Sequence, residues 1–429
     1  MITKPVLVSR QAARRLEVRR QHLEGARPSR GSRADILAVT RDLGYVQIDP
    51  VTVVAPSHWI SLWARVGPFS VSDLDRMLWK DRTLFECWTH AASYVPTEDY
   101  PIHSAIMRRY PDSLSKSWGY QKAEAKRWIP AHAGLRKVIL RELETGPHLL
   151  KDFADHTKGP RSTDAWSEGS ALATMLVHLQ FGGEVMVVGH KGGQNLYGLP
   201  SSFLPDWVDR TDLSQSEAET VGVQRTLRAI GVATRTEINR YLLRGRYLDL
   251  RGVLDRLIEQ SVVCRVQIEG LRGTRYALAS DIDSLVRIGS EDWEEEISLI
   301  PPFDNMVFHQ ARTKELYGFD YVREQFLPER KRKFGTYVLP ILWGDRFIGR
   351  IDPRLDRASK RLEIKGVHAE PGAPRGRSVA AQLAERIEQL ATFLGAETVV
   401  YSDRVPTEWR DALHRRSYRG TITLRRDRR

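Results

Sequence analysis

One order of predicted elements occurs twice in this sequence and constrains its fold most: three helices followed by two strands joined by a glycine-containing turn. In the first copy, hydrophobic periodicity and Gly or Pro breaks predict the elements. The helices are expected at 135–144, 148–154 and 168–181, and the strands at 184–189 and 194–199. This is the element order of a winged helix.

The second copy follows directly along the chain. Its helices are predicted at 216–230, 234–243 and 250–260, and its strands at 262–268 and 275–278. The repetition lies in the order of the elements and not in the identity of the residues. We therefore expect two tandem winged helices in the middle of the chain.

The N-terminal region is predicted to be helical and is a candidate for a third, less regular copy. Ser9 and Ser32 each precede an apolar helical pattern and are expected N-caps, while Gly25 and Gly44 are expected to end the two helices. A third amphipathic helix is predicted to begin at Ser72.

After residue 293 the sequence changes to a β-rich pattern. Strands are predicted at 297–300, 336–342, 347–351, 362–367 and 398–402, with one helix at 378–394. The predicted fold class is therefore α+β, with tandem winged-helix domains and a β-rich C-terminal domain.

These patterns predict four domains. They are residues 1–131, a helical or winged-helix-like domain; 132–213 and 214–285, two winged helices; and 286–429, the β-rich domain. Linkers are expected around 111–132, 201–213 and 281–294.

The charge of the chain suggests its partner. The 429 residues include 66 Lys plus Arg against 54 Asp plus Glu, for a formal net charge of +12. Arginine suits phosphate because its guanidinium is always charged and donates in a planar fork, so nucleic acid is the first partner to test. The basic clusters at 330–333 (RKRK) and 424–429 (LRRDRR) fit either loose phosphate contacts or a solvated surface.

Several classes of protein are excluded by composition. No apolar run approaches the roughly 20 residues that a membrane-spanning helix requires. The N-terminal segment lacks a hydrophobic signal region, so we expect a cytoplasmic protein with no membrane contact. Cys87 and Cys264 lie far apart and neither belongs to a CxxC motif, which argues against a disulfide framework, a zinc finger and a four-cysteine iron–sulfur cluster.

The best candidate for chemistry is the segment YVQIDP, residues 45–50. A residue before proline favours extended geometry, and a strand would place Gln47 and Asp49 on one face, roughly 6 to 7 Å apart. One water fits between an amide and a carboxylate at that spacing. Asp49 can accept its proton or offset positive charge, while Gln47 orients it. The structural alternative is an Asp that satisfies turn amides beside an ordinary surface Gln.

Two further clusters mix polar and aromatic residues. Glu86 and His90 in FECWTHAAS would share a face in either a helix or a strand, so they could form a proton-transfer pair or a structural contact. No third ligand stands at metal spacing, so no metal site is expected. The segment PFDN at 302–305 is followed by Arg312 and GFDY at 318–321, and its structural alternative is an Asx turn.

These motifs resemble, in order and over nearly the whole chain, the AlkZ/YcaQ family of bacterial DNA glycosylases. The segments that carry the resemblance are YVQIDP with His58 and Trp59, FECWTHAAS, PFDN, YGFDY at 317–321, and FGTYVLP at 334–340 running on to Gly349-Arg350-Ile351-Asp352. The Gln-x-Asp motif is similar to that of the YcaQ branch, which has the broader substrate range. Residues 107–129 have no confident match, so contacts there stay unassigned.

The resemblance implies a monofunctional DNA glycosylase for base excision repair that removes bulky N-alkylated purines and unhooks interstrand crosslinks, with no metal or organic cofactor. Its catalytic residues are expected to be Gln47 and Asp49. Candidate supporting residues are Glu86, His90, Tyr45 and His58, and candidate DNA-binding residues are Asp304, Asn305, Arg312 and Arg350. The partner is double-stranded DNA with alkylated purines or crosslinks, bound by a monomer associated with the nucleoid.

The residues leave two other functions open. A winged-helix transcription regulator would explain the repeats and the charge, and it would make sequence-specific contacts in a DNA groove. It gives no reason for Gln47 and Asp49 to share a face. A metal-dependent nuclease would need clustered carboxylates, and Asp49 has no convincing partner in the sequence.

Overall fold

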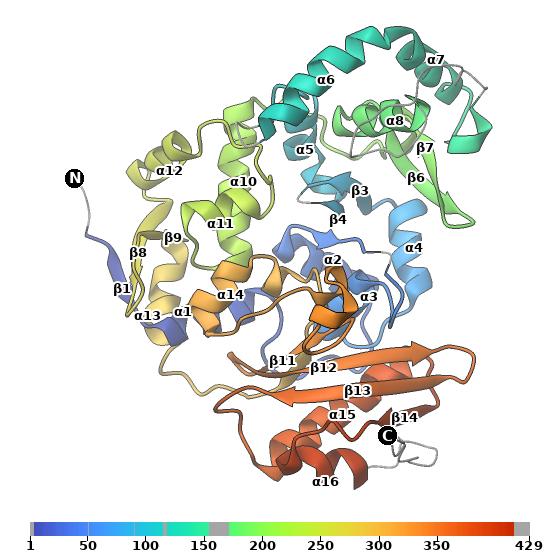
Figure 1. Ribbon diagram of the computed structural model, residues 1–429. Helices are drawn as coiled ribbons and strands as arrows, with labels where there is room; N and C mark the ends of the chain where they lie inside the picture. The colour runs from blue at the N-terminus through green and yellow to red at the C-terminus, as the bar shows by residue number, and fades with distance from the viewer. Residues whose placement is uncertain (1–3, 50, 90, 115–117, 154–170, 416–429) are drawn as a thin grey trace. The chain divides into compact units, whose positions relative to one another are not determined.

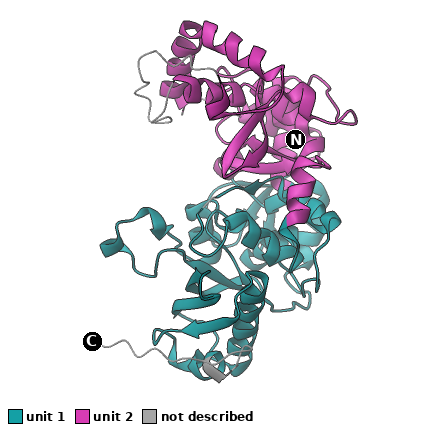
Figure 2. Ribbon diagram, turned by 90° about the vertical axis from the view of Figure 1, so that its right-hand side faces the viewer, with its two compact units in different colours: residues 1–71, 228–234, 264–429 teal, residues 72–227, 235–263 magenta. Residues whose placement is uncertain are grey.

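The computed structural model describes residues 4–49, 51–89, 91–114, 118–153 and 171–415 (Figure 1). By contacts between its residues the chain divides into two compact units. Unit 1 comprises 1–71, 228–234 and 264–429, and unit 2 comprises 72–227 and 235–263 (Figure 2). The predicted α+β class is confirmed. The division into four domains stays a prediction.

Unit 1 combines helices near the N-terminus with a large C-terminal sheet. Its α-helices are α1 (Arg10–Arg20), α2 (Arg33–Leu43), α3 (Ser57–Val66), α13 (Ile282–Arg287), α14 (Gln310–Tyr317), α15 (Arg377–Phe393) and α16 (Thr407–Arg415). Its strands are β1 (Val6–Val8), β2 (Val46–Gln47), β8 (Val263–Ile268), β9 (Arg275–Leu278), β10 (Ile297–Leu299), β11 (Leu339–Trp343), β12 (Arg346–Asp356), β13 (Arg361–Ala369) and β14 (Thr398–Tyr401). Its 3₁₀ helices are η4 (Ala279–Asp281), η5 (Asn305–Val307), η6 (Glu324–Phe326) and η7 (Glu329–Lys331).

The C-terminal sheet has the order β10-β11-β12-β13-β14. Neighbouring strands from β10 to β13 are antiparallel, and β14 joins β13 in parallel after the long helix α15. This helix packs against β10 and β14 at opposite edges of the sheet (Figure 1). The pairing of β12 with β13 shifts register between Asp352 and Pro353, where a proline cannot donate to the ladder.

Unit 2 is mainly helical and holds two hairpins. Its helices are α4 (Val71–Trp79), α5 (Tyr100–Met107), α6 (Gly119–Ala131), α7 (Ala133–Leu143), α8 (Ala171–Phe181), α9 (Pro200–Phe203), α10 (Gln215–Ile230), α11 (Arg235–Arg240) and α12 (Leu250–Glu259), with η1 (Thr97–Asp99) and η3 (Leu150–Asp152). Its strands are β3 (Leu84–Trp88), β4 (Ala92–Pro96), β5 (His148–Leu149), β6 (Met186–Lys191) and β7 (Gln194–Gly198). The last residues of α10 and nearly all of β8 belong to unit 1.

Two expectations about secondary structure were wrong, and one strand was not predicted. The helix predicted at 148–154 is the short strand β5, which pairs with β7, followed by η3. The linker predicted at 111–132 contains α6. The N-terminal segment forms β1, which lies parallel to β8. In each case the pairing or packing partner is distant in sequence, so local pattern carries little signal.

The N-terminal helices follow their predicted caps closely. Ser9 accepts a hydrogen bond from the Ala12 amide, and Ser32 forms a capping box with Asp35. Gly44 ends α2 with φ of 77°, a left-handed conformation that costs a glycine little. The first helix stops at Arg20, before the predicted Gly25. No helix in the described parts of the chain is long and apolar enough to cross a membrane.

Candidate active site

The predicted catalytic strip begins where Gly44 turns the chain out of α2. Strand β2 contains just Val46 and Gln47, so the extended strand expected to continue through Asp49 is shorter than predicted. Val46 is 1% exposed and anchors the strip in the core, Gln47 is half-buried, and Asp49 is 6% exposed. The strip is therefore packed into unit 1 and is not a solvated loop.

The two carboxylate oxygens of Asp49 differ in their surroundings. Oδ1 accepts a hydrogen bond from the Val51 amide at 3.3 Å, which is the turn contact that the structural alternative predicts. Oδ2 is buried and has no hydrogen-bond partner among the described residues. Burial raises the pKa of the Asp49 carboxyl, and the Val51 hydrogen bond opposes that rise. One oxygen is thus fixed by the backbone, and the other is left to accept from a ligand or water.

Tyr337 is a buried polar residue that lies close enough to Asp49 for the two groups to interact electrostatically. Its ring is 0% exposed, and its hydroxyl lies 3.5 Å from the Ala55 carbonyl oxygen. Burial raises the pKa of Tyr337 and the negative charge of Asp49 adds to the rise, while a hydrogen bond with Ser57 opposes it. The phenol therefore stays protonated at neutral pH and is a hydrogen-bond donor beside the strip.

Two carboxylates, the buried Glu324 and the half-buried Asp352, fix the segment that carries Tyr337. Glu324 Oε2 accepts from the amides of residues 333, 334 and 335 at 3.0, 2.8 and 3.1 Å. Asp352 Oδ1 accepts from the amides of residues 336 and 337, both at 3.1 Å. Gly335 has φ of +151°, and a Cβ there would lie 2.0 Å from Asp352 Cγ, so this position requires glycine. Five consecutive amides are held, which gives Tyr337 a fixed position.

The segment after the motif is fixed by strand β12 and the residue that follows it. Leu355 donates its amide to the Val53 carbonyl at 3.0 Å, and the Arg357 guanidinium donates to the carbonyls of Thr52 and Val54, both at 2.9 Å. These bonds hold residues 52–54 against the sheet. They explain how a strip with so little regular structure keeps its position.

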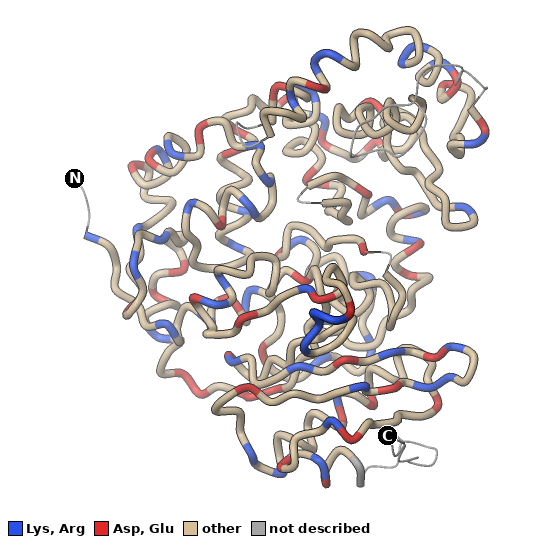
Figure 3. Tube along the Cα trace, in the orientation of Figure 1, with Lys and Arg blue, Asp and Glu red and all other residues tan. Residues whose placement is uncertain are grey.

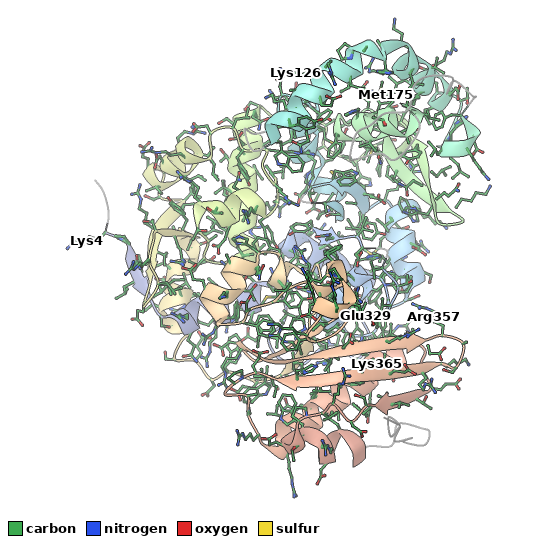
Figure 4. All side chains as sticks on the ribbon, in the orientation of Figure 1. Lys4, Lys126, Met175, Glu329, Arg357 and Lys365 are labelled. Atoms are coloured by element: carbon green, nitrogen blue, oxygen red, sulfur yellow. The ribbon has the colours of Figure 1, made fainter. Side chains whose placement is uncertain are left out.

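A pocket of about 520 Å³ adjoins this segment within unit 1. Its lining residues are Thr52, Val53, Thr336, Asp352, Pro353, Arg354, Leu355, Arg357 and Lys365. Figure 4 labels two of these residues, Arg357, which follows β12, and Lys365 on β13. Of its three cations, Arg357 donates to backbone carbonyls and Lys365 pairs with Glu363 at 2.6 Å, while no partner is found for Arg354 among the described residues.

The PFDN segment braces the strip through buried contacts. Asp304 forms a bidentate ion pair with Arg65, at 2.7 and 2.9 Å, and both side chains are 0% exposed. Arg65 also donates to Gln21. Asn305 donates from Nδ2 to the backbone carbonyl of Tyr45 at 3.2 Å, directly before β2. These residues therefore hold the strip in place.

Arg312 and Arg350 are also buried in unit 1. Arg312 pairs with Glu17 and donates to the carbonyls of residues 230 and 232. Arg350 pairs with Glu370 at 2.5 Å and stacks over Phe334 at 4.0 Å. A buried, engaged side chain offers no surface to DNA, so the structure argues against Asp304, Asn305, Arg312 and Arg350 as DNA contacts.

Of the candidate supporting residues, Tyr45 and His58 lie in unit 1 and Glu86 lies in unit 2. Tyr45 is 1% exposed, and His58 is 6% exposed near the start of α3. Glu86 lies in unit 2, on β3, where its Oε2 is 3.3 Å from Nε2 of His190, and the nearby carboxylate raises the pKa of His190. His90 and the basic tail at 424–429 lie outside the described residues, so the expected pair of Glu86 with His90 stays a prediction.

No role was expected from the sequence for Tyr337, Ser57, Arg65 or Arg357. Tyr337 stands in FGTYVLP, a segment that carried the resemblance, so a signal for it was present. The partners of Arg65 and Arg357 are hundreds of residues away, and no local pattern marks them. Among the described residues, no cluster of three or more His, Cys, Asp or Glu side chains could hold a metal ion.

Comparisons with known proteins identify the family and the fold of the chain. A family model described as DNA glycosylase AlkZ-like matches residues 40–393, which include the strip, its bracing segments and most of the C-terminal sheet. The solved structure of the Streptomyces sahachiroi DNA glycosylase AlkZ superposes with a TM-score of 0.66 at 15% identity, covering 94% of this chain and 100% of that chain, which shows a shared fold. The chain belongs to the AlkZ-like family of DNA glycosylases.

Proposed function

We propose that this DNA glycosylase hydrolyses the N-glycosidic bond of N-alkylated purines, of the N7-alkylguanine type, with Asp49 and Gln47 as its catalytic residues. The observation that carries the proposal is the Asp49 carboxylate, which has one oxygen fixed by a backbone amide and the other without a partner in the described chain. Such a group can hold or activate one water while staying in place.

The chemistry of the substrate fits these groups. Alkylation at N7 places positive charge on guanine, so the base leaves without a strong acid to protonate it. The remaining demands are to stabilise an oxocarbenium-like sugar and to deliver water, which glycoside hydrolases meet with carboxylates. Asp49 offsets the developing charge and activates the water, and Gln47 orients it near the anomeric carbon. No lysine acts as nucleophile, so the product is an abasic site.

Interstrand crosslinks are proposed as part of the substrate range, because the Gln47-Ile48-Asp49 motif resembles that of the YcaQ branch. A crosslinked base is tethered to the opposite strand and cannot be fully flipped, which favours a site that works within a groove. We propose that the enzyme acts as a monomer on nucleoid DNA in the cytoplasm. Phosphate contacts by Arg and Lys would supply most of the affinity, which would fall with salt.

Base release from a defined duplex tests the proposal. A duplex with one 7-methylguanine, incubated with the enzyme in EDTA, should yield free 7-methylguanine and a strand that breaks at the abasic site only after alkali treatment. A nitrogen-mustard crosslink and its monoadduct, assayed in parallel, test the substrate range. Binding without base release would favour a DNA-binding regulator, and cleavage that EDTA abolishes would favour a metal-dependent nuclease.

The rate of base release is expected to fall in acid. The carboxylate is the active form of Asp49, and burial raises its pKa above the ordinary value of 3.8, so activity should be lost as pH falls through that raised pKa. Single-turnover rates at saturating enzyme, measured from pH 4 upward, give the profile. The residual rate of Asp49→Asn should lack this acid limb. An acid limb that persists unchanged in the variant would assign the titration to another group.

A further inference from the structure

Residues 322–334, here called the aromatic loop, expose apolar side chains that a folded chain usually buries. Phe326 is 70% exposed and Val322 is 41% exposed. Both stand in unit 1, in the loop between α14 and β11. A single exposed apolar side chain is common on protein surfaces, so the neighbours of Phe326 decide whether it marks a binding site.

The aromatic loop is held rigidly by its own hydrogen bonds. Glu324 accepts from three amides at the far end of the loop, and its carbonyl accepts from the Leu327 amide at 2.8 Å. Arg332 donates from Nε to the Leu327 carbonyl at 3.0 Å and from Nη1 to Thr336 Oγ1 at 3.1 Å. Phe326 is therefore presented by a fixed loop, which reduces the ordering cost of binding.

Phe303, from the PFDN segment, supports the exposed ring. The Phe303 and Phe326 rings meet edge to face, with centroids 5.9 Å apart, and the Arg323 guanidinium lies 5.2 Å from the Phe303 centroid. Phe303 has φ of 70°, a left-handed conformation that is strained for a bulky side chain. Its neighbour Asp304 is fixed by Arg65, so the surrounding structure imposes this conformation.

The same loop carries cations that have no acidic partner in the described structure. Arg330, Lys331 and Lys333 are exposed, and no ion pair forms at any of them within the described residues. Figure 3 shows this run of Lys and Arg on the trace, and Figure 4 labels the neighbouring Glu329. Exposed cations around an exposed ring match a polyanion that also has stacked apolar surfaces, which is DNA.

The PFDN segment, against which Phe326 packs, is joined to the catalytic strip and to the start of α3 within unit 1. The Pro302 carbonyl, one residue before Phe303, accepts from the Ser57 hydroxyl, and Asn305 donates to the Tyr45 carbonyl. The segment after the loop carries Tyr337, whose pKa burial raises and the negative charge of Asp49 raises further. The loop is therefore connected to the strip through the PFDN segment, which Phe326 contacts at Phe303.

We propose that the aromatic loop is a DNA wedge: Phe326 inserts between base pairs beside the lesion, supported by Phe303, while Arg330, Lys331 and Lys333 bind phosphates. An inserted apolar side chain unstacks a base step and bends the duplex. Such a wedge opens the stack around a base that cannot be flipped. The occupant is double-stranded DNA, and the link to lesion removal rests on the proposed function.

The test of the wedge uses the full-length enzyme and the variant Phe326→Ala. A duplex with one 7-methylguanine and 2-aminopurine at the adjacent step reports unstacking as increased fluorescence on binding. Leu7→Ala, at a residue 62% exposed on β1 of unit 1, is the matched control for loss of an exposed apolar side chain. Thermal unfolding of each variant checks that the fold is intact.

We expect wild type and Leu7→Ala to raise the fluorescence and Phe326→Ala to leave it near the free-DNA level. Base release from the fully paired duplex should fall about tenfold or more in Phe326→Ala, because unstacking then has to occur without the wedge. The loss should be much smaller when the lesion sits in a bulge. An unchanged fluorescence response or an unchanged duplex rate in Phe326→Ala would overturn the proposal.

The cations are tested by the salt dependence of binding. The triple variant Arg330→Ala, Lys331→Ala, Lys333→Ala should bind undamaged and damaged duplex more weakly, by the same factor for both. The slope of log binding constant against log salt concentration should become shallower by about 0.9 for each phosphate that is no longer neutralised. Arg346→Ala, at the exposed start of β12, is the control for loss of a surface cation outside the loop. An unchanged slope would contradict the phosphate binding. If fluorescence depends on Phe326 but no base is released, the wedge stands and the proposed function fails.

Discussion

Replacement of Asp49 by asparagine is expected to slow base release by about 10² to 10⁴, the range typical for loss of a general base. Asparagine keeps the size of the side chain and can still accept from the Val51 amide, but it carries no negative charge. The loss therefore reports the carboxylate itself. Single-turnover release of 7-methylguanine at saturating enzyme measures the chemical step without a contribution from binding.

The control for this experiment is Asp320→Asn. Asp320 is an exposed carboxylate of unit 1 that is paired with Lys314 at 2.8 Å and lies outside both the catalytic strip and the aromatic loop. Its variant should release base at the wild-type rate, and both variants should bind undamaged duplex as the wild type does. A rate for Asp49→Asn within about threefold of wild type would show that the carboxylate has no catalytic role.

Loss of the buried pair between Arg65 and Asp304 is expected to have the largest effect on stability. The variant Arg65→Met removes a guanidinium that is 0% exposed and leaves the Asp304 carboxylate buried without its counter-charge. Breaking a buried pair by removing one partner costs about 3 to 5 kcal/mol. Because Arg65 also holds Gln21 and the PFDN segment, unit 1 should unfold at a clearly lower denaturant concentration than in the wild type.

The matched control is Lys314→Ala, which removes one partner of an exposed pair whose side chains are 65% and 52% exposed. Exposed pairs contribute about 0 to 1 kcal/mol, so this variant should unfold nearly as the wild type does. Urea unfolding followed by tryptophan fluorescence measures both variants. Equal midpoints for Arg65→Met and Lys314→Ala would mean that the buried pair does not brace unit 1.

Local signals in the sequence predict much of the fold. The caps at Ser9 and Ser32 and the left-handed Gly44 come from side-chain and backbone chemistry within a few residues, and the structure confirms them. Strand β9 has its predicted bounds, because alternation and turns mark it locally. The motif at 45–50 is also marked locally, because Pro50 favours extended geometry in the residue before it and Gln47 and Asp49 are two residues apart.

Contacts between distant segments are what the sequence does not show. Strand β1 forms because β8 offers an edge more than 250 residues later. Arg312 and Arg350 read as surface cations in a basic chain, but Glu17 and Glu370 accept them in buried pairs. The supports of the strip, Tyr337 and Arg357, likewise depend on partners that only the folded chain brings close.

A double-mutant cycle on base release tests most directly whether Gln47 and Asp49 act together on one water. The rates of wild type, Gln47→Ala, Asp49→Asn and the double variant are measured on the 7-methylguanine duplex under single-turnover conditions. If the amide orients the water that the carboxylate activates, the double variant should be little slower than Asp49→Asn alone. Two losses that simply multiply, or no loss in either single variant, would contradict a shared water.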